Sequence, residues 1–177
     1  MFFFDCEMKE IPSEIATFLK KSGVSYETYE HAPITTCAEG LLIAEKIGSA
    51  CCKSLLMKNK KQFFLFVIPG EKKFDSKKVS SFLGTGHLSF ASESDLKELM
   101  KTFPGAVSIL GLVYDKDHKV SVFFDESILS LSRIDCHPCC NDISLVLPVK
   151  DVLEKLLPKL GNSFQAIPSE LLSGVSK

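Results

Sequence analysis

The spacing of apolar residues along the chain alternates between the periods of helices and strands. One predicted helical face carries four apolar residues before Gly23 ends the segment: Ile11, Ile15, Phe18 and Leu19. Apolar runs bounded by turn residues predict strands over 26–31, 54–58, 62–68, 88–91, 120–123 and 144–147. The run over 62–68 is almost continuously apolar, which is typical of a central strand covered on both faces.

Capping signals place further helices between these strands. We expect helices over 36–46, 75–82, 92–100 and 148–157, two of which begin with a capping-box signature, Thr36 with Glu39 and Ser92 with Asp95. The three-residue turn over 59–61 joins two predicted strands and therefore implies antiparallel pairing. The mixed order of elements favours an α+β fold with a largely antiparallel mixed sheet and surrounding helices.

The chain shows neither a linker nor an internal repeat. We expect one domain over residues 1–160 and a C-terminal tail over 161–177. The tail contains Pro168 and small polar residues, which predicts that it is weakly ordered.

Composition narrows the class of protein. With 45% hydrophobic and 24% charged residues in 177, the chain has enough apolar material for a core. No apolar run approaches the roughly 20 residues of a membrane helix, so we expect no membrane partner. The first residues lack a secretory signal pattern, so the seven cysteines are expected to be reduced thiols of a cytoplasmic protein. A Walker loop, a GxGxxG motif and an HExxH motif are all absent from the sequence.

The net charge of -1 conceals an uneven distribution. The segment 53–78 contains eight lysines and two acids, a balance of +6, so the rest of the chain sums to -7. Lysines at strand ends and turns are suited to contact nucleic-acid phosphates, and the candidates are Lys58, Lys60, Lys61, Lys72 and Lys73. The alternative is a lysine-rich face that only contacts solvent. Because Arg133 is the single arginine, reading of guanine edges is not expected, and DNA is not an expected partner.

Several polar residues are candidates for a site. Lys53 stands at the mouth of a predicted strand, where it either extends to solvent or holds an anionic or carbonyl group of a substrate. His31 either closes a strand or contacts a substrate. The small residues from Gly105 to Ser108 could expose backbone amides of the kind that form an oxyanion site.

A second candidate cluster spans residues 136–141. Cys136, His137, Cys139 and Cys140 invite a zinc interpretation, with Cys51 and Cys52 to complete the site. The spacing lacks a second matching Cys-x-x-Cys pair, and a redox Cys-x-x-Cys normally opens a helix. Pro138 instead indicates a rigid loop that fixes the imidazole of His137 and the amide of Asn141.

Together these segments resemble the YbaK/ProX-type aminoacyl-tRNA editing family, relatives of the insertion domain of bacterial prolyl-tRNA synthetases. The resemblance runs from about Ile15 to Leu157. Its blocks are YETYEHAP at 26–33, KSLLMK at 53–58, LSFASE at 88–93, PGAVS at 104–108 and HPCCN at 137–141. The nearest subgroup is the free-standing prolyl-tRNA editing proteins.

The resemblance implies a trans-editing aminoacyl-tRNA deacylase, most closely one for alanyl-tRNA(Pro), with prolyl-tRNA synthetase as a candidate partner and no cofactor or metal. It assigns the functional cation to Lys53 and the loop beside the ester to Gly105. It also implies that His137 lines the aminoacyl pocket. Beside it, we expect Ser54, His31, Ser108 and Asn141 to contact or shape the bound aminoacyl group. The chain departs from the family pattern at Ser54 and Ile109, where the family has asparagine and proline, and at Cys139 and Cys140, which replace asparagine and aspartate.

Two alternatives stay open from the sequence. One is a non-catalytic tRNA- or synthetase-binding module of the same fold, which the changes at Ser54 and Ile109 permit. The other is a thiol or zinc protein built on the cysteines. At 177 residues the chain has no room for a synthetase core, so we expect any editing to occur in trans.

Overall fold

The structure is a computed structural model that describes residues 10–175. The segment 1–9, where the sequence analysis expects no secretory signal, and residues 176–177 of the predicted tail lie outside the described residues. In the described part, no helix is long and apolar enough to cross a membrane.

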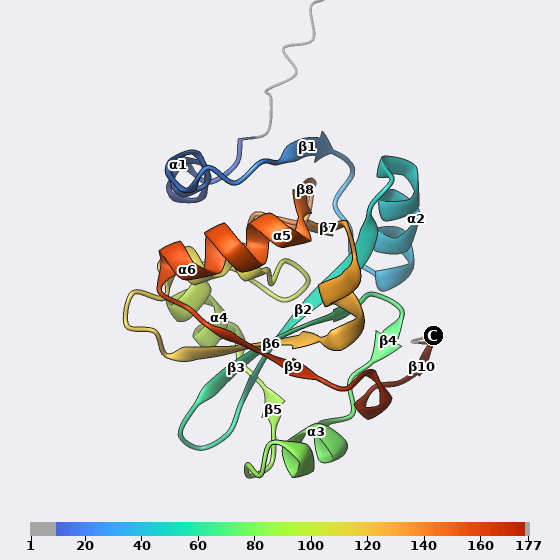
Figure 1. The fold of residues 1–177 in the computed structure, drawn as a ribbon, viewed down its shortest axis with the longest axis vertical. Coiled ribbons are helices and arrows are strands. Elements are labelled where there is room, and N and C mark those ends of the chain that lie inside the picture. Colours follow the sequence, from blue (N-terminus) through green and yellow to red (C-terminus); the bar gives the residue numbers. More distant parts are fainter. Residues whose placement is uncertain (1–9, 176–177) are drawn as a thin grey trace, which may run out of the picture.

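A mixed sheet forms the centre of the molecule (Figure 1). Its order is β1-β8-β7-β2-β3-β6-β9, and β5 pairs with β2 off this path. The pairs β1–β8, β7–β8, β2–β3 and β2–β5 are antiparallel, while β2–β7, β3–β6 and β6–β9 are parallel. The strands are β1 (Glu27–Glu30), β2 (Ala50–Lys58), β3 (Phe63–Pro69), β5 (Ser89–Phe90), β6 (Val120–Asp125), β7 (Arg133–Cys136), β8 (Ile143–Pro148) and β9 (Phe164–Ile167). The predicted α+β class is confirmed.

Helices cover both faces of this sheet (Figure 1). The helices are α1 (Ser13–Ser22), α2 (Cys37–Ile47), α3 (Ser76–Phe82), α4 (Glu93–Met100), α5 (Val149–Asp151) and α6 (Leu157–Leu160). A π-helical turn over Val152–Leu156 joins the last two, and 3-10 helices span Ile109–Tyr114, Glu126–Ser130 and Ser169–Leu171. The larger core lies between the sheet and α1, α4, α5 and α6, and a smaller core lies under α3.

The local signals in the sequence account for most of the helix boundaries. Both capping boxes are present: Thr36 caps α2 with Glu39, and Ser92 caps α4 with Asp95. The helix α1 ends at Gly23, whose φ of 68° lies in the left-handed region that glycine adopts without strain. The predicted central strand is β3, and its residues 64–68 are all buried.

Two local predictions were wrong. Strand β2 begins at Ala50 rather than at residue 54, so Lys53 lies within the strand and pairs with Ile68 instead of standing at its mouth. The segment after residue 161 is not weakly ordered in its described part. β9 pairs with β6, and β10 (Ser173–Val175) pairs with β4 (Lys72–Lys73) in a separate two-stranded sheet. Burial of Ile167 and Leu172 against the smaller core stabilises this segment, and a local reading of composition misses such contacts.

Candidate active site

One edge of β2 is only partly paired, and this leaves a gap in the sheet. On that edge β7 pairs with β2 at residues 50–51, and β5 pairs with it at residues 57–58. Among the described strands, none pairs with residues 52–56 on the same edge. A gap of this kind exposes backbone donors and acceptors that a ligand can use.

The backbone of Ser54 faces this gap. The Cys52 N–H donates to Asp135 Oδ1 over 3.4 Å, and the Leu56 carbonyl accepts from the Ala91 N–H over 2.9 Å, both on the gap side of β2. In a strand, the N–H and C=O groups of every second residue point to the same edge. The N–H and C=O of Ser54 therefore point into the gap as well.

A cavity of about 380 Å³ opens at the gap. Five parts of the chain form its walls: the start of α2, the strand β2, the end of β3, the segment over 90–107 and the end of β7. The lining residues are Ile34, Thr35, Thr36, Cys37, Gly40, Cys51, Cys52, Lys53, Ser54, Leu55, Leu56, Gly70, Phe90, Ala91, Leu96, Pro104, Gly105, Val107, Asp135, Cys136 and His137.

Four of the residues predicted to form the site meet at this cavity. Lys53 and Ser54 come from β2, Gly105 from the loop after α4, and His137 from the residue after β7. Within the described part of the chain, Lys53 forms no ion pair, so its charge is available to an anionic or carbonyl group. The tertiary structure thus brings together residues as far apart in the sequence as Lys53 and His137.

The loop at Gly105 presents backbone amides at the mouth of the cavity. Gly105 is exposed and has a φ of 92°, which favours glycine. The Ala106 N–H donates to the Phe103 carbonyl within the turn, and the Thr102 hydroxyl holds the Ala106 carbonyl at 2.9 Å. For residues 10–175, the N–H groups of Gly105 and Val107 have no such bond, so they are free to bind an oxygen of a substrate.

His31 lies behind the cavity wall rather than on it. Its Nδ1 lies 2.8 Å from the Ala32 carbonyl, and its Nε2 lies 2.9 Å from the Ser144 hydroxyl. The ring meets His137 edge-on, with centroids 5.8 Å apart. His31 therefore supports the position of His137 and does not line the cavity.

Ser108 and Asn141 also lie outside the lining. Ser108 is buried, and its hydroxyl accepts from the Leu110 N–H at the start of a 3-10 helix. The Asn141 amide donates to the Ile34 carbonyl over 3.0 Å, and the Asn141 carbonyl accepts from the Ile34 N–H over 2.8 Å. Asn141 thus fixes Ile34, which is itself part of the cavity wall.

Comparison with known proteins identifies this architecture. The family model of the aminoacyl-tRNA editing domain matches residues 31–155. The chain belongs to this family. The family predicted from the sequence is confirmed, and the matched residues include β2, the Gly105 loop and His137.

Individual relatives agree with the assignment to the editing-domain family. The chain is 34% identical over 151 residues to the prolyl-tRNA editing protein ProX of Acetoanaerobium sticklandii, covering 84% of this chain and 92% of that protein. It is 29% identical over 82 residues to the proline–tRNA ligase of Macrococcus caseolyticus, covering 46% of this chain and 14% of the ligase. A solved structure of a candidate trans-editing enzyme for prolyl-tRNA synthetase superposes with a TM-score of 0.65 at 18% identity, covering 89% of this chain and 98% of that one.

The sequence analysis missed one ionisable residue of the editing-domain cavity. Asp135 is 6% exposed, lies in β7 and lines the cavity. Its burial raises the pKa of the carboxyl to about 6, against hydrogen bonds from backbone N–H groups that act to lower it. The sequence did contain a signal for this residue. Asp135 is an acid between Ile134 and Cys136, in a segment whose other residues fit a buried strand.

The raised pKa of Asp135 predicts a pH-dependent gain in stability for Asp135→Asn. The folded carboxyl keeps its proton up to about pH 6 while the unfolded one releases it near 3.8, so the free energy of unfolding falls between those values as pH rises. Above pH 6 the variant should be more stable than the wild type by up to about 3 kcal/mol, and below pH 4 the two should agree. Urea unfolding at pH 3.5 and pH 7.5 measures both differences; a variant less stable at pH 7.5 would contradict the burial argument.

His137 is an uncharged imidazole at neutral pH. Burial, followed by the nearby His31, lowers its pKa to about 4, against a smaller opposing effect of Asp142. Its Nδ1 is buried and has no hydrogen-bond partner in the part of the chain that the structure describes. His137 can therefore shape the cavity and exchange a hydrogen bond with a ligand, but it does not supply a positive charge.

Three of the thiols that line the cavity, those of Cys51, Cys52 and Cys136, are held in the protonated form, which is a poor nucleophile. Burial is the main cause that raises the pKa of Cys51 to about 12, and it raises the pKa values of Cys52 and Cys136 strongly as well. A nucleophilic or metal-binding cysteine needs the opposite shift, toward the thiolate. Among residues 10–175, no three His, Cys, Asp or Glu side chains lie together as a metal site.

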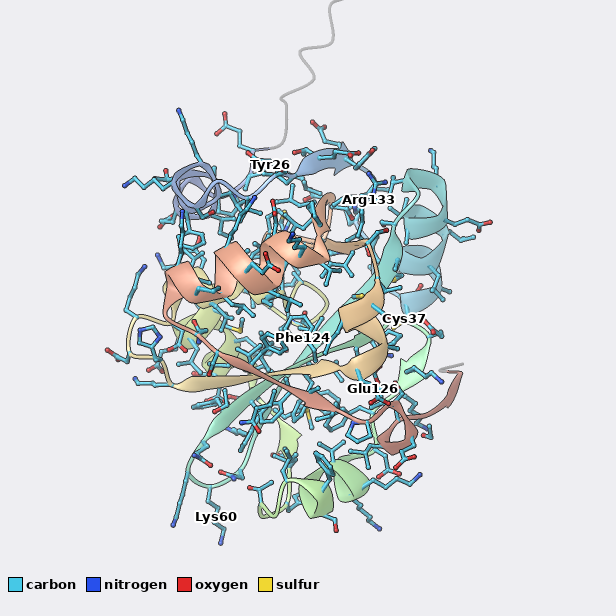
Figure 2. All side chains as sticks on the ribbon, in the orientation of Figure 1. Tyr26, Cys37, Lys60, Phe124, Glu126 and Arg133 are labelled. Carbon is cyan, nitrogen blue, oxygen red and sulfur yellow. The ribbon has the colours of Figure 1, made fainter. Side chains whose placement is uncertain are left out.

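The predicted lysine face separates into two groups at opposite ends of β3, which is about 20 Å long. Lys60 and Lys61 are exposed at the β2–β3 turn, and Figure 2 shows Lys60 pointing away from the body of the protein. Lys72 and Lys73 form β4, beyond the other end of β3 (Figure 1). Lys58 Nζ lies 2.5 Å from Asp95 Oδ2, so its charge is already paired at the start of α4.

Lys60 and Lys61 line a second cavity beside the first. Its wall includes the loop over 84–87 and Ser89. The neighbouring residue of β5, Phe90, is 64% exposed and lines the first cavity. Strand β5 therefore joins an apolar, partly enclosed cavity to a basic one.

Proposed function

We propose that this protein is a trans-editing deacylase that hydrolyses the ester between a small amino acid and the terminal ribose of a misacylated tRNA, most specifically alanyl-tRNA(Pro). The observation that carries the proposal is the cavity of an editing-family domain at which Lys53, Ser54, Gly105 and His137 meet. The relatives named as a prolyl-tRNA editing protein and as a proline–tRNA ligase favour proline tRNA.

Lys53 binds the terminal nucleotide in this proposal. Its ammonium is the cation of the cavity and acts on the phosphate or on the ester carbonyl, which positions the ester for attack by water. The N–H and C=O of Ser54 on the open edge of β2 are suited to hold the ribose or the amino acid beside it. An aminoacyl ester is already activated, so the domain acts mainly by positioning and by stabilising charge.

The Gly105 loop stabilises the oxyanion that forms as water adds to the ester carbonyl. The free N–H groups of Gly105 and Val107 are the candidate donors, since the Ala106 N–H is used in its turn. The positive φ of Gly105 gives this loop its shape. The leaving group is the ribose oxygen of the ester. The neighbouring free hydroxyl of the ribose assists as this oxygen takes up a proton.

Selection of the amino acid follows from the size of the cavity end near His137. A hydrophobic synthetic site rejects a smaller amino acid by only about 1–3 kcal/mol per missing methylene, so small amino acids such as alanine escape rejection. A second, smaller pocket can hydrolyse what fits it. Here the neutral His137 and the Ile34 wall held by Asn141 set that limit.

Misacylated tRNA is the proposed partner, and prolyl-tRNA synthetase is the candidate supplier of it. The match to ProX spans 92% of that protein, which supports action of this domain in trans. Phosphates of the acceptor strand would follow β5 from the first cavity toward Lys60 and Lys61. Lys72 and Lys73 are a separate basic group, placed to contact a different part of the tRNA.

Release of labelled amino acid from tRNA tests the function directly. Alanyl-, cysteinyl- and seryl-tRNA, each on proline tRNA, are incubated with the protein, and the free amino acid is measured. The proposal expects release of alanine well above the buffer rate and little release of proline from correctly charged tRNA. Binding of tRNA without release would instead support a non-catalytic module of the same fold.

Charge reversal at the β2–β3 turn should weaken tRNA binding. Lys60→Glu with Lys61→Glu removes two phosphate contacts, so the affinity at low salt falls and the slope of log K against log salt decreases by about 1.4–1.8. Filter binding over a range of salt concentrations measures both. The same reversal at Lys72 and Lys73 tests the second group separately. Exposed Lys20 and Lys21 on α1 provide the matched control, and equal losses in all three pairs would argue against a defined binding surface.

A further inference from the structure

The buried carboxylate of Asp135 lacks a cationic partner in the described chain. It is 6% exposed and lines the cavity, and its Oδ1 accepts a long hydrogen bond of 3.4 Å from the Cys52 N–H. Across residues 10–175, no lysine, arginine or histidine forms an ion pair with it. A buried charge in this position is costly unless a ligand supplies the opposite charge.

Among the described residues, the sheet neighbours of Asp135 are neutral. Strand β2 brings the thiols of Cys51 and Cys52, and β7 itself brings Cys136; burial keeps all three protonated. Strand β8 pairs the apolar Val146 with it. The charged groups Lys53 and Glu71 act on the pKa of Cys51, and Glu71 also acts on that of Cys52. His137, two residues further on, is uncharged at neutral pH. Asp135 is thus the acidic residue of the cavity lining, and Lys53 is its basic residue.

The substrate class proposed above contains a cation next to its ester. An aminoacyl group has its α-ammonium one carbon away from the carbonyl that is attacked. In the proposed function the terminal nucleotide lies at Lys53, and an aminoacyl group that follows the open edge of β2 toward Cys52 would reach Asp135, which accepts the Cys52 N–H there. A hydrogen bond between an ammonium and a carboxylate in such a dry site is strong and directional.

We propose that Asp135 binds the α-ammonium group of the aminoacyl ester, so that the site accepts esters with a free amino group and rejects N-acylated ones. The inference rests on the proposed deacylase function and adds a specificity-determining residue to it. Peptidyl-tRNA and formylated initiator tRNA have an amide in place of the ammonium, and the site would therefore leave both intact. Binding of the ammonium also compensates the burial of the carboxylate.

The test compares two substrates that differ only at the amino group. Alanyl-tRNA(Pro) and N-acetylalanyl-tRNA(Pro) are hydrolysed by the wild type and by Asp135→Asn, which keeps the size of the side chain and an oxygen for the Cys52 N–H. We expect the wild type to prefer the free amine by at least about 10-fold in kcat/KM. The variant should lose about 10- to 100-fold on alanyl-tRNA(Pro) and change little on the acetylated ester.

A pH profile separates recognition of charge from a structural effect. The wild-type kcat/KM for the free-amine ester should fall below about pH 6 as Asp135 takes up a proton, and this limb should be absent in Asp135→Asn. The matched control is Asp115→Asn. Asp115 is buried too, but it binds the N–H groups of Lys119 and Val120 outside the cavity, so its replacement should leave selectivity and the profile unchanged.

The outcomes distinguish this inference from the proposed function. If the wild type releases no amino acid from either ester, the deacylase proposal itself fails. If it hydrolyses both esters at equal rates, deacylation stands and the role of Asp135 is overturned. Equal losses on both esters in Asp135→Asn, with an unchanged pH profile, would also overturn it, because Asp135 would then act only on the shape of the cavity.

Discussion

Lys53→Ala should reduce kcat/KM for alanyl-tRNA(Pro) by at least about 100-fold, the loss typical of removing one group that stabilises charge in a transition state. Lys53 is the cation that lines the cavity, and it projects from the middle of β2, which is held by β3 on its other edge. An alanine cannot replace the contact, and Lys58, the other lysine of β2, is paired with Asp95. Initial rates of alanine release at saturating and at limiting tRNA measure the loss.

Lys46→Ala is the matched control for this experiment. Lys46 is exposed in the last turn of α2, away from the cavity lining, so its removal should leave the rate unchanged. A thermal melt of each variant shows that the fold is intact. Lys53→Arg keeps the charge but changes its shape, and we expect it to restore only part of the activity. Equal rates for Lys53→Ala and the wild type would remove Lys53 from the mechanism and with it the central part of the proposed function.

Phe66→Ala should lower the free energy of unfolding by about 3–5 kcal/mol, the range for removing a buried aromatic ring. Phe66 lies in the centre of β3 and is 0% exposed. Its ring packs against three others, with centroids 4.8 Å from Phe74, 5.1 Å from Phe123 and 6.4 Å from Phe64. The cavity left by the missing ring would lie in the smaller core, which holds β3 and β6 against α3. Chemical denaturation with urea measures the loss.

Phe82→Ala provides the comparison for Phe66→Ala. Phe82 ends α3 and is 51% exposed, so the same change of residue should cost much less than at Phe66. If the two variants lose equal stability, the smaller core does not contribute to the fold as its burial implies. Since β3 also supports β2, Phe66→Ala should lower activity only at temperatures at which the variant begins to unfold.

Local patterns in the sequence accounted for most elements because each depends on neighbouring residues. The capping boxes at Thr36 and Ser92 begin their helices as expected, since the partners lie only three residues away. The apolar run of β3 is central in the sheet because a strand buried on both faces requires apolar side chains at every position. The boundaries of β2 were missed because the segment 50–53 is extended only by its pairing with β3 and β7.

The candidate site also contains residues that the sequence identified and residues whose role only the structure shows. Lys53, Ser54, Gly105 and His137 could be selected from the sequence because short motifs resemble an editing family, and the cavity brings these four together. His31, Ser108 and Asn141 belong to the same motifs but bind other parts of the protein. A sequence motif shows which residues occur together. It does not show whether a side chain faces the cavity or supports the cavity wall from behind.

The sequence by itself determined the helices, the central strand, the family and the concentration of lysines in residues 53–78, because periodicity, caps and motifs are local properties. Only the tertiary structure decided that the second edge of β2 is open between β7 and β5, and that a cavity forms there. It also divided the lysines between two ends of β3 and placed the carboxylate of Asp135 in the cavity. These features depend on contacts between residues that are far apart in the chain, and burial and pKa follow from such contacts rather than from the neighbours in sequence.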